Sequence, residues 1–507
     1  MIGFTVSRAL KWWAWDKPDR IALDYEGEAV GYADLYAWAL RVATWLRRKG
    51  VRPGDRVMMV GENSLDYAML IVGTALAGGI AAPVTFRSSA RELRRALDLL
   101  APCLLMTDAA RAQTARAALA EGEKQDIPME AIEIVRALRD APDPPPAYEA
   151  RPEDPLFIIG TSGSTGAPKG VVYTQGSTMA YAAEFAIMEP ATGNGGSVLA
   201  AGPYSSSSGT LLLFQFLSVG ATIFAENRFT PERALALLSG KRITTFLAST
   251  IFFERLAALP EFADADLSSL KFAQVGGARV NPSLIARFQA KGVTLRQAYG
   301  CTEAGGAWAA RDETALAEPE KCGPGGLFSD YAIARPDGSL ATPGEPGEIL
   351  VRSPALAAGY WNDPEQTATT FRDGWLRTGD RGVLDARGNL TFIDRIKDII
   401  ISGGLNISAM EVENAIAQID GVAEVVVLAA PDAEFGETPL AVVHGDLGRL
   451  DPRAILAHCR RELAAYKLPR YIALEAGPLP RLPSGKISRA ALREKYSDAP
   501  AFLERLR

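Results

Sequence analysis

Residues 160 to 170, GTSGSTGAPKG, combine the residue types that bind a polyphosphate. Glycines let backbone N–H groups approach phosphate oxygens, hydroxyl groups add donors, and a lysine adds positive charge. The preceding apolar run, LFIIG, predicts a strand directly before this turn. The spacing does not match GxxxxGK followed by Ser or Thr, so the turn is not a Walker loop. Taken alone, the segment fits an unliganded surface turn equally well. The candidate phosphate-binding residues are Thr161, Ser162, Gly163, Ser164, Thr165, Gly166 and Lys169.

Histidine and cysteine are too sparse for several other kinds of site. The two histidines, His444 and His458, lie near the carboxyl end, and no GxSxG elbow accompanies them. This argues against a Ser-His-Asp hydrolase and against imidazole-rich metal sites. The four cysteines are far apart and form no CxxC pair, which argues against a zinc site or a disulfide framework and fits a reducing cytoplasm.

Composition indicates a large protein without a nucleic-acid partner. The chain has 507 residues, of which 48% are hydrophobic, so we expect a large core and more than one folding unit. The net charge is -6 and no sustained Lys/Arg run is present, which argues against a nucleic-acid-binding surface. The amino terminus is a poor secretory signal, and we expect its aromatic residues to lie in the core.

The uncharged stretch from Tyr67 to Phe86 has the length of a membrane span. Gly78, Gly79 and Pro83 interrupt it, however, which predicts a buried helix followed by a buried strand. We therefore expect no integral membrane segment.

Short apolar strands alternate with helical stretches through most of the first 390 residues, from RVMMVG at 56 to TLRQAYG at 294. This alternation predicts an α/β fold with mixed, largely parallel sheets flanked by helices. After Asp330, turn signals such as PDGS and PGEPGEI separate short strands, which predicts a small β-rich subdomain. From about Arg395 the pattern predicts a compact α+β unit of typical domain size.

Four further segments follow the glycine-rich turn in order: AYGCTEAGG (298 to 306), GWLRTGD (374 to 380), DRIKDIIISGGLNISAMEVE (394 to 413) and RLPSGKISR (481 to 489). Together with the turn, they resemble the AMP-forming acyl- and aryl-CoA synthetases of the adenylate-forming superfamily. The resemblance implies an N-terminal AMP-binding domain over residues 1–394, with its β-rich subdomain at about 330–394. It also implies a small mobile C-terminal domain over 395–507.

The resemblance implies a two-step reaction and a role for each motif. The turn would hold the β and γ phosphates of ATP while the substrate carboxylate attacks the α phosphorus and pyrophosphate leaves. Glu303 would position Mg²⁺, and Thr302 would donate to the α phosphate. Tyr299 would stack on adenine, Gly300 beside it would belong to the same nucleotide site, and Asp380, assisted by Arg395, would bind the ribose hydroxyls. The opposite adenine wall would be formed by Gly276, Gly277 and Ala278.

By the same resemblance, the carboxyl-terminal motifs supply the catalytic lysine, the hinge and the thiol channel. Lys486 would bridge the carboxylate and the α phosphate and stabilise the negative transition state of adenylation. Lys397 matches the hinge about which the C-terminal domain turns before the second step. Gly403 and Gly404 would then leave a side-chain-free channel for the thiol of coenzyme A; a plain hairpin turn is the alternative.

The sequence departs from the family at the acyl pocket. Many relatives carry an aromatic-His pair where this chain has GPYSSSSG (202 to 209), and Ser206 stands where histidine is common. Serines make a smaller and more polar wall, so neither CoA use nor the substrate is inherited through this segment. The expected pocket residues are Tyr204, Ser206, Phe252 and Trp308, which suggest an apolar or aromatic acid, although core packing explains the aromatic ones equally well.

The resemblance therefore predicts a cytoplasmic ligase that uses ATP, Mg²⁺ and coenzyme A to convert a small carboxylic acid into its CoA thioester. An enzyme that loads a carrier protein, or stops at the acyl-AMP, is the first alternative. A luciferase-like oxygenase would use the same adenylate without needing the glycine channel, and a nucleotide sensor would bind ATP without releasing pyrophosphate. The identity of the acid and the quaternary state, a homodimer included, are left open.

Overall fold

The structure, a computed structural model, describes residues 3–121, 127–142, 147–162, 168–276, 280–402, 405–432, 434–463, 465–482 and 486–506. The chain divides into two compact units, and the predicted boundary at residue 395 stays a prediction. The first unit comprises Met1–Ala332, Leu350–Thr378 and Asp385–Leu390, and the second comprises Ile333–Ile349, Gly379–Leu384 and Thr391–Arg507.

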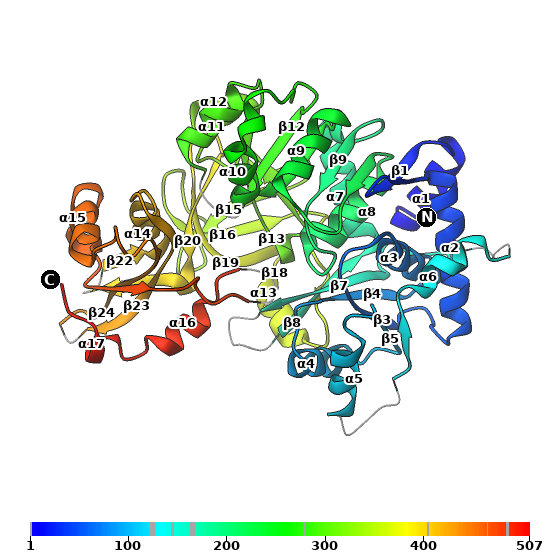
Figure 1. The fold of residues 1–507 in the computed structure, drawn as a ribbon, viewed down its shortest axis with the longest axis horizontal. Coiled ribbons are helices and arrows are strands. Elements are labelled where there is room, and N and C mark those ends of the chain that lie inside the picture. The colour runs from blue at the N-terminus through cyan, green and yellow to red at the C-terminus, as the bar shows by residue number, and fades with distance from the viewer. Residues whose placement is uncertain are drawn as a thin grey trace. The chain divides into compact units, whose positions relative to one another are not determined.

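An eight-stranded sheet in the first unit has the order β14-β13-β12-β11-β9-β10-β1-β2 (Figure 1). Its inner strands are parallel, and only the outer pairs β1–β2 and β13–β14 are antiparallel, which confirms the predicted sheet type. The strands are β1 (Ile21–Tyr25), β2 (Glu28–Gly31), β9 (Ser197–Ala200), β10 (Thr222–Ala225), β11 (Thr245–Ser249), β12 (Phe272–Gly276), β13 (Leu295–Cys301) and β14 (Gly306–Ala309).

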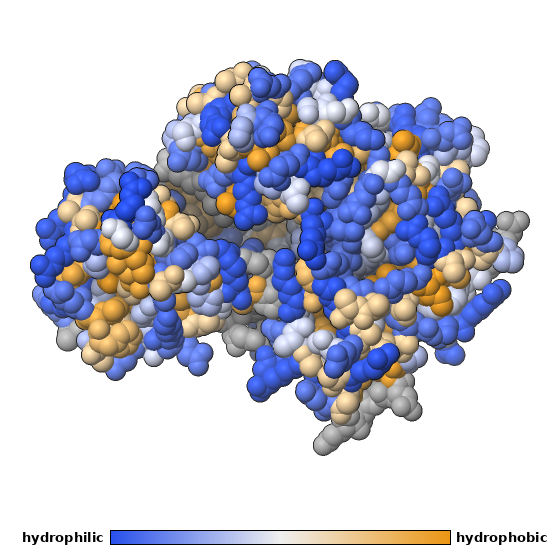
Figure 2. Space-filling view, in the orientation of Figure 1, coloured by the Kyte–Doolittle hydropathy of each residue, from blue (hydrophilic) through white to orange (hydrophobic). Residues whose placement is uncertain are grey.

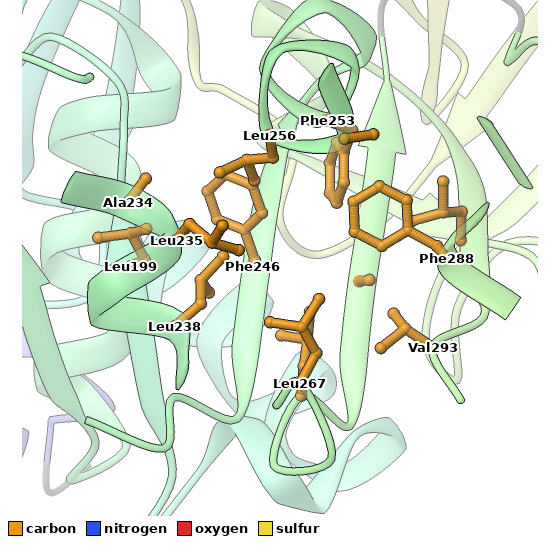
Figure 3. Close-up of a cluster of buried hydrophobic side chains, with 14 of the residues drawn as sticks. Leu199, Ala234, Leu235, Leu238, Phe246, Phe253, Leu256, Leu267, Phe288 and Val293 are labelled. Atoms are coloured by element: carbon orange, nitrogen blue, oxygen red, sulfur yellow. The ribbon is translucent and has the colours of Figure 1, made fainter. Parts of the chain in front are cut away.

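Crossover helices cover this sheet and bury an aromatic core. Figure 3 shows Phe246 of β11, Phe253 of α10 and Phe288 of α11 in one cluster, and their ring centroids are separated by 4.9 and 5.4 Å. Helices of the two crossovers meet over the sheet because each presents an apolar face to it. The helices on this part of the chain are α7 (Gln175–Met188), α8 (Ser207–Ser218), α9 (Pro231–Gly240), α10 (Thr250–Ala258), α11 (Pro282–Gln289) and α12 (Asp312–Ala317).

A seven-stranded sheet in the same unit has the order β17-β8-β7-β4-β3-β5-β6. Strands β3 to β7 are parallel, whereas β8 runs antiparallel to both β7 and β17. The strands are β3 (Arg56–Gly61), β4 (Ile80–Thr85), β5 (Leu104–Thr107), β6 (Met129–Ala131), β7 (Pro155–Ser162), β8 (Pro168–Thr174) and β17 (Gly359–Tyr360). The accompanying helices are α2 (Tyr32–Arg48), α3 (Leu65–Ala77), α4 (Ala90–Leu100), α5 (Ala112–Ala120), α6 (Ile134–Ala137) and α13 (Pro364–Thr370).

The uncharged stretch after Tyr67 folds as predicted, into the buried helix α3 and the buried strand β4. The Ser64 side chain caps the start of α3, and Gly78 ends it with φ +83°, a conformation that favours glycine. None of the helices in the described ranges combines the length and apolar character needed to cross a membrane.

The expectation for the amino-terminal aromatic residues was wrong in part. In α1 (Val6–Asp16), Trp13 packs inward and its indole N–H donates to the Ser218 carbonyl at 2.8 Å. Trp12 and Trp15 are 52% and 71% exposed and contact each other instead. A helix of 3.6 residues per turn cannot bury three aromatic residues at these spacings on one face, because Trp12 and Trp15 lie one turn apart while Trp13 lies about 100° round from Trp12.

Two smaller sheets complete the chain. One has the order β15-β16-β19-β18 with β20 beside β19, and the other has the order β22-β21-β24-β23 with β25 beside β24. Along β23, Val427 points into one core and its neighbours Val426 and Leu428 into another, as the period of two in a strand requires. The first sheet contains β15 (Asp330–Ala334), β16 (Gly347–Arg352), β18 (Phe371–Arg372), β19 (Trp375–Leu384) and β20 (Leu390–Arg395). The second contains β21 (Ile399–Ser402), β22 (Leu405–Ser408), β23 (Val422–Asp432), β24 (Gly436–Gly445) and β25 (Tyr471–Glu475), with α14 (Ala409–Ile416), α15 (Pro452–Glu462), α16 (Arg489–Lys495) and α17 (Ala499–Phe502).

The face seen in Figure 2 is mainly hydrophilic, with hydrophobic residues scattered among the polar ones. Scattered apolar residues are normal on a folded protein and need no partner. The alternating pattern of sheets and crossover helices, with a separate α+β segment at the carboxyl end, confirms the predicted fold class.

Candidate active site

Most of the predicted site residues of the first unit lie at the carboxyl edge of the eight-stranded sheet. Strands β9, β11, β12 and β13 are parallel, so their carboxyl ends meet at one edge, where α/β proteins bind ligands. Tyr204 and Ser206 follow β9, and Phe252 follows β11. Gly276 ends β12, and β13 leads through Tyr299 into the Thr302–Glu303 turn.

The glycine-rich turn connects two antiparallel strands. The strand predicted before it is β7, which places Thr161 opposite Lys169 of β8, and Ser162 opposite Pro168. The central residues of the turn, Gly163, Ser164, Thr165 and Gly166, lie outside the described residues. The hairpin therefore brings the two described ends of the turn, one hydroxyl and one ammonium, to the same place on the sheet.

Three hydrogen bonds, one from β8 of this hairpin and two from the segment Ala357 to Tyr360, reach the turn that carries Glu303. The Tyr173 hydroxyl of β8 donates to the Thr302 carbonyl at 2.6 Å. The Ala357 N–H donates to the Glu303 carbonyl at 3.1 Å. The Tyr360 hydroxyl of β17 donates to Glu303 Oε1 at 2.9 Å. Segments almost 200 residues apart in the sequence are thus fixed around the candidate metal ligand.

Tyr360 also contacts the candidate phosphate-binding lysine. Lys169 Nζ lies over the Tyr360 ring, 5.0 Å from its centroid, a cation–π geometry. Burial, together with the charge of Glu303 and the hydrogen bond to it, raises the pKa of Tyr360 above its ordinary value. The phenol therefore stays protonated and remains a donor. Sequence reasoning missed Tyr360 because a tyrosine in AAGYWNDPE marks no chemistry until the fold brings it to Glu303.

The residues around Glu303 fit a magnesium ion that is shared with a nucleotide. Within the described ranges, no group of three or more His, Cys, Asp or Glu side chains could hold a metal ion alone. Mg²⁺ is commonly held by one or two carboxylates together with substrate phosphates. Glu303 fits this arrangement as a single carboxylate, one oxygen of which, Oε1, accepts from Tyr360.

The predicted adenine wall is described only in part. Among the described residues, a Cβ atom on Gly276 would meet only the Ala298 carbonyl oxygen, at 3.8 Å. The Tyr299 ring is 6% exposed and packs edge-on against Tyr331 at 5.8 Å. Gly277 and Ala278 lie outside the described residues. The contact of these residues with adenine stays a prediction.

Gly300 has a packing role that can be tested directly. A Cβ atom there would lie 2.2 Å from the Gly306 carbonyl oxygen of the neighbouring strand β14. We expect Gly300→Ala to destabilise the protein by about 1–3 kcal/mol, because backbone atoms would have to move. The midpoint of urea unfolding measures this change. Gly240→Ala is the matched control, because nothing lies within 4 Å of its added Cβ; an equal loss in both variants would contradict this explanation.

The predicted acyl-pocket residues have different surroundings. Tyr204 is buried against Tyr67, and the hydroxyl of Ser206, at the start of α8, donates to the Pro203 carbonyl at 2.8 Å. Phe252 is half-buried and packs edge-on against Phe229. These observations neither assign nor exclude a pocket role for the three residues, so that role stays a prediction.

Trp308 is held by a carboxylate that the sequence analysis missed. The Trp308 indole N–H donates to Glu184 Oε2 at 3.0 Å, and Glu184 is 1% exposed. Ser329 Oγ and the Phe328 N–H also donate to this carboxylate. Glu184 lies within the apolar helix α7, where the sequence gives no sign that three donors will converge on it.

In the second unit, two of the predicted nucleotide-binding residues form an ion pair. Asp380 of β19 is 5% exposed, and Arg395 Nε lies 3.4 Å from its Oδ1. The Arg395 side chain is about half exposed, so the Asp380 carboxylate can accept from a second partner as well as from Arg395.

The predicted catalytic lysine lies on the loop before α16. Its surroundings desolvate the Lys486 ammonium and, together with the charge of Arg395, lower the pKa of Lys486 below its ordinary value, although the residue remains exposed. Both effects favour loss of the proton.

This lowered pKa predicts a pH dependence. If adenylation needs the Lys486 charge, its rate should fall as the pH rises through a pKa below that of an ordinary lysine. Arg395→Gln removes a like charge, so the pKa of Lys486 rises and the alkaline fall should move to higher pH. Pyrophosphate release measured from pH 7 to pH 10 tests both expectations. An alkaline limb that stays in place in Arg395→Gln would refute the coupling.

The predicted hinge and thiol channel lie close together in the chain. Lys397 is the central residue of a short 3-10 helix, Ile396–Asp398, between β20 and β21. Strands β21 and β22 pair antiparallel with Ser402 opposite Leu405. Gly403 and Gly404, which connect them, lie outside the described residues. Their role as a channel and that of Lys397 as a hinge stay predictions.

Comparison with known proteins gives matches over nearly the whole chain. A family model described as AMP-binding enzyme matches residues 10–361, and one described as AMP-binding enzyme C-terminal domain matches residues 411–486. A feruloyl-CoA synthase of an Amycolatopsis species is 34% identical over 483 residues, which cover 94% of this chain and 96% of the relative. A long-chain-fatty-acid–CoA ligase of Mycobacterium tuberculosis is 34% identical over 475 residues, covering 92% and 93%.

Solved structures agree with these matches. The o-succinylbenzoate CoA synthetase of Bacillus subtilis, in complex with an acyl-adenylate intermediate, has a TM-score of 0.87 and 27% identity, covering 96% of this chain and 97% of that one. The same synthetase in complex with ATP and magnesium ion has a TM-score of 0.86 and 27% identity, covering 96% and 99%.

Proposed function

Since the chain belongs to the AMP-binding enzyme family and is an AMP-forming acid–CoA ligase, we propose that it activates an aryl or aliphatic carboxylic acid at the carboxyl edge described above. ATP, Mg²⁺ and coenzyme A are the co-substrates and the metal of such a reaction. The observation that carries the proposed site is the array of Lys169, Tyr360 and Glu303, which places a cation over the face of one ring and a carboxylate at its hydroxyl.

In the first step, a carboxylate oxygen of the substrate attacks the α phosphorus of ATP and pyrophosphate leaves. Lys169 and the hydroxyl of Thr161 bind the β and γ phosphates, so the leaving pyrophosphate is stabilised by charge and by hydrogen bonds. Thr302 donates to the α phosphate, and Glu303 would hold a Mg²⁺ ion, which would neutralise phosphate charge. Asp380 accepts from the ribose hydroxyls, and Lys486 bridges the attacking carboxylate and the α phosphate.

In the second step, the thiol of coenzyme A attacks the acyl carbonyl carbon, and AMP leaves with the oxygen that joined it to the acyl group. The adenylate is needed because a free carboxylate carries a negative charge and has no leaving group. Movement about Lys397 would take Lys486 out of the path of the thiol. A carrier-protein thiol is the alternative acceptor, and it would use the same adenylate.

The pocket favours an acid with an apolar body. Phe252 after β11 and Phe229 after β10 contact each other and would form an aromatic wall, and the run of serines at 205–208 after β9 would form a small polar one. Such a pocket binds an apolar group while hydrogen-bonding a polar substituent. We also propose a cytoplasmic location, because all four cysteines are free thiols and a reducing compartment keeps them so.

The proposed activity is tested by pyrophosphate release. The protein is incubated with ATP and Mg²⁺ and with aryl, medium-chain and long-chain acids in turn, and coenzyme A or a phosphopantetheinyl carrier protein is then added. We expect acid-dependent pyrophosphate release, and consumption of the adenylate by coenzyme A. Consumption by the carrier alone would exclude coenzyme A as the acceptor, and no pyrophosphate with any acid would refute the proposal.

A further inference from the structure

We propose that Tyr360 is a positioning residue for adenylation, which holds Glu303 ready for the metal ion and keeps Lys169 apart from it. The inference rests on the proposed function, because it takes Glu303 as the magnesium ligand and Lys169 as a phosphate ligand. Tyr360 itself touches neither the phosphates nor the metal in this account. It acts through Lys169 and Glu303, the two side chains that it contacts.

The first part of the inference concerns the carboxylate of Glu303. The Tyr360 hydroxyl donates to Oε1 at 2.9 Å, and the Glu303 carbonyl accepts from Ala357 at 3.1 Å. One side-chain oxygen and the backbone of Glu303 are therefore fixed from the same segment of chain. A hydrogen-bonded carboxylate has fewer orientations to lose when it binds a cation, and partners of this kind strengthen metal binding.

The second part concerns charge. Lys169 and Glu303 carry opposite charges and share Tyr360 as a neighbour, yet within the described part of the chain no ion pair joins them. Lys169 lies over the ring, and Glu303 accepts from the hydroxyl at its edge. The ring thus separates the two charges, and each remains available: the ammonium for phosphate oxygens and the carboxylate for Mg²⁺. A direct ion pair would neutralise both groups before ATP arrives.

Tyr360 can serve as a spacer because its backbone is anchored to β8, the strand that carries Lys169. Tyr360 lies opposite Val171 in the pairing of β17 with β8. The N–H groups on either side donate to this strand, Ala358 to the Val172 carbonyl at 2.8 Å and Trp361 to the Gly170 carbonyl at 2.7 Å. The Tyr360 N–H donates to Thr367 Oγ1 at 2.9 Å. The distance between lysine and tyrosine is therefore set by sheet register.

The test compares Tyr360→Phe with the wild type in titrations of Mg²⁺ at saturating ATP and acid. Phenylalanine keeps the ring under Lys169 and removes only the hydroxyl. We expect the Mg²⁺ concentration for half-maximal pyrophosphate release to rise about 10-fold or more, as for other partners of metal ligands. The KM for the acid, and the rate of thioester formation from a supplied acyl adenylate, should stay unchanged. Tyr360→Ala should in addition raise the KM for ATP, because Lys169 loses the ring that separates it from Glu303.

Two controls make the result specific. Tyr148→Phe removes a comparable hydroxyl, which donates to the Asp154 carboxylate at 3.2 Å near the opposite end of β7, and should leave the Mg²⁺ requirement unchanged. In the Glu303→Gln background, Tyr360→Phe should add no further change, because the two residues act as one unit. Two outcomes would overturn this inference and leave the proposed function standing. One is that Tyr360→Phe raises the Mg²⁺ requirement equally in the wild-type and Glu303→Gln backgrounds. The other is that Glu303→Gln raises the Mg²⁺ requirement and Tyr360→Phe does not. No shift in Glu303→Gln would overturn the proposed metal role and this inference with it.

Discussion

Lys486→Ala is expected to lower the rate of acyl-adenylate formation by at least about 100-fold, the effect of removing a group that stabilises transition-state charge. The substrate carboxylate and the α phosphate are both anionic, and Lys486 is the cation proposed to lie between them. Thioester formation from a supplied acyl adenylate should stay within a few-fold of the wild type, since that step begins after the adenylate exists. Acid-dependent pyrophosphate release and direct thiolysis measure the two steps separately.

Lys495→Ala is the matched control for this change. Lys495 lies in the same unit, and its ammonium pairs with Glu475 at the surface. Its removal should leave both steps unchanged, because an exposed ion pair contributes little to stability. If Lys486→Ala released pyrophosphate at the wild-type rate, Lys486 would have no role in adenylation.

Lys397→Pro should have the opposite pattern and slow thioester formation by about 100-fold, a loss typical of small misplacements of reacting groups. Proline fixes φ near −65° and restricts the residue before it, so a hinge at this point could not change its torsions. Binding of ATP should be unaffected. The rate at which a preformed acyl-AMP is consumed by coenzyme A measures the effect.

Lys397→Ala separates the backbone from the side chain. Alanine leaves the torsions free, so thioester formation should be much faster in Lys397→Ala than in Lys397→Pro. Equal loss in the two variants would mean that the lysine side chain acts in the second step, and turnover of Lys397→Pro at the wild-type rate would argue against a hinge at residue 397.

The elements that sequence predicted best are those whose signals are local. Helix α3 has a serine cap at its start and a left-handed glycine at its end, so the uncharged run could be divided without knowledge of the fold. Buried parallel strands such as β3 appear as continuous apolar runs. The exposure of Trp12 and Trp15 was not predictable in this way, because an apolar residue is assigned to the core by type while helix geometry decides which side it faces.

Candidate site residues could be named from the sequence where they belong to motifs. Residues that matter only through a partner brought close by the fold could not. Glu303 and Lys169 belong to recognisable segments; Lys169 lies near the start of β8 and Glu303 in the turn after β13, and their roles stay predictions. Tyr360 and Glu184 belong to no such segment, and each acquires its role by contact with residues more than fifty positions away, Tyr360 with Glu303 and Glu184 with Trp308. A single sequence gives no sign of such pairings, because the fold brings these residues together.

The transfer of an oxygen isotope from the acid to AMP tests the central claim most directly. The substrate acid is labelled with ¹⁸O in its carboxylate and converted with unlabelled ATP and coenzyme A. If a carboxylate oxygen attacks the α phosphorus, one labelled oxygen must appear in the phosphate of AMP when the thiol displaces it. We predict that label in AMP, with pyrophosphate as the other product. Label in inorganic phosphate together with ADP, or AMP free of label, would contradict the account.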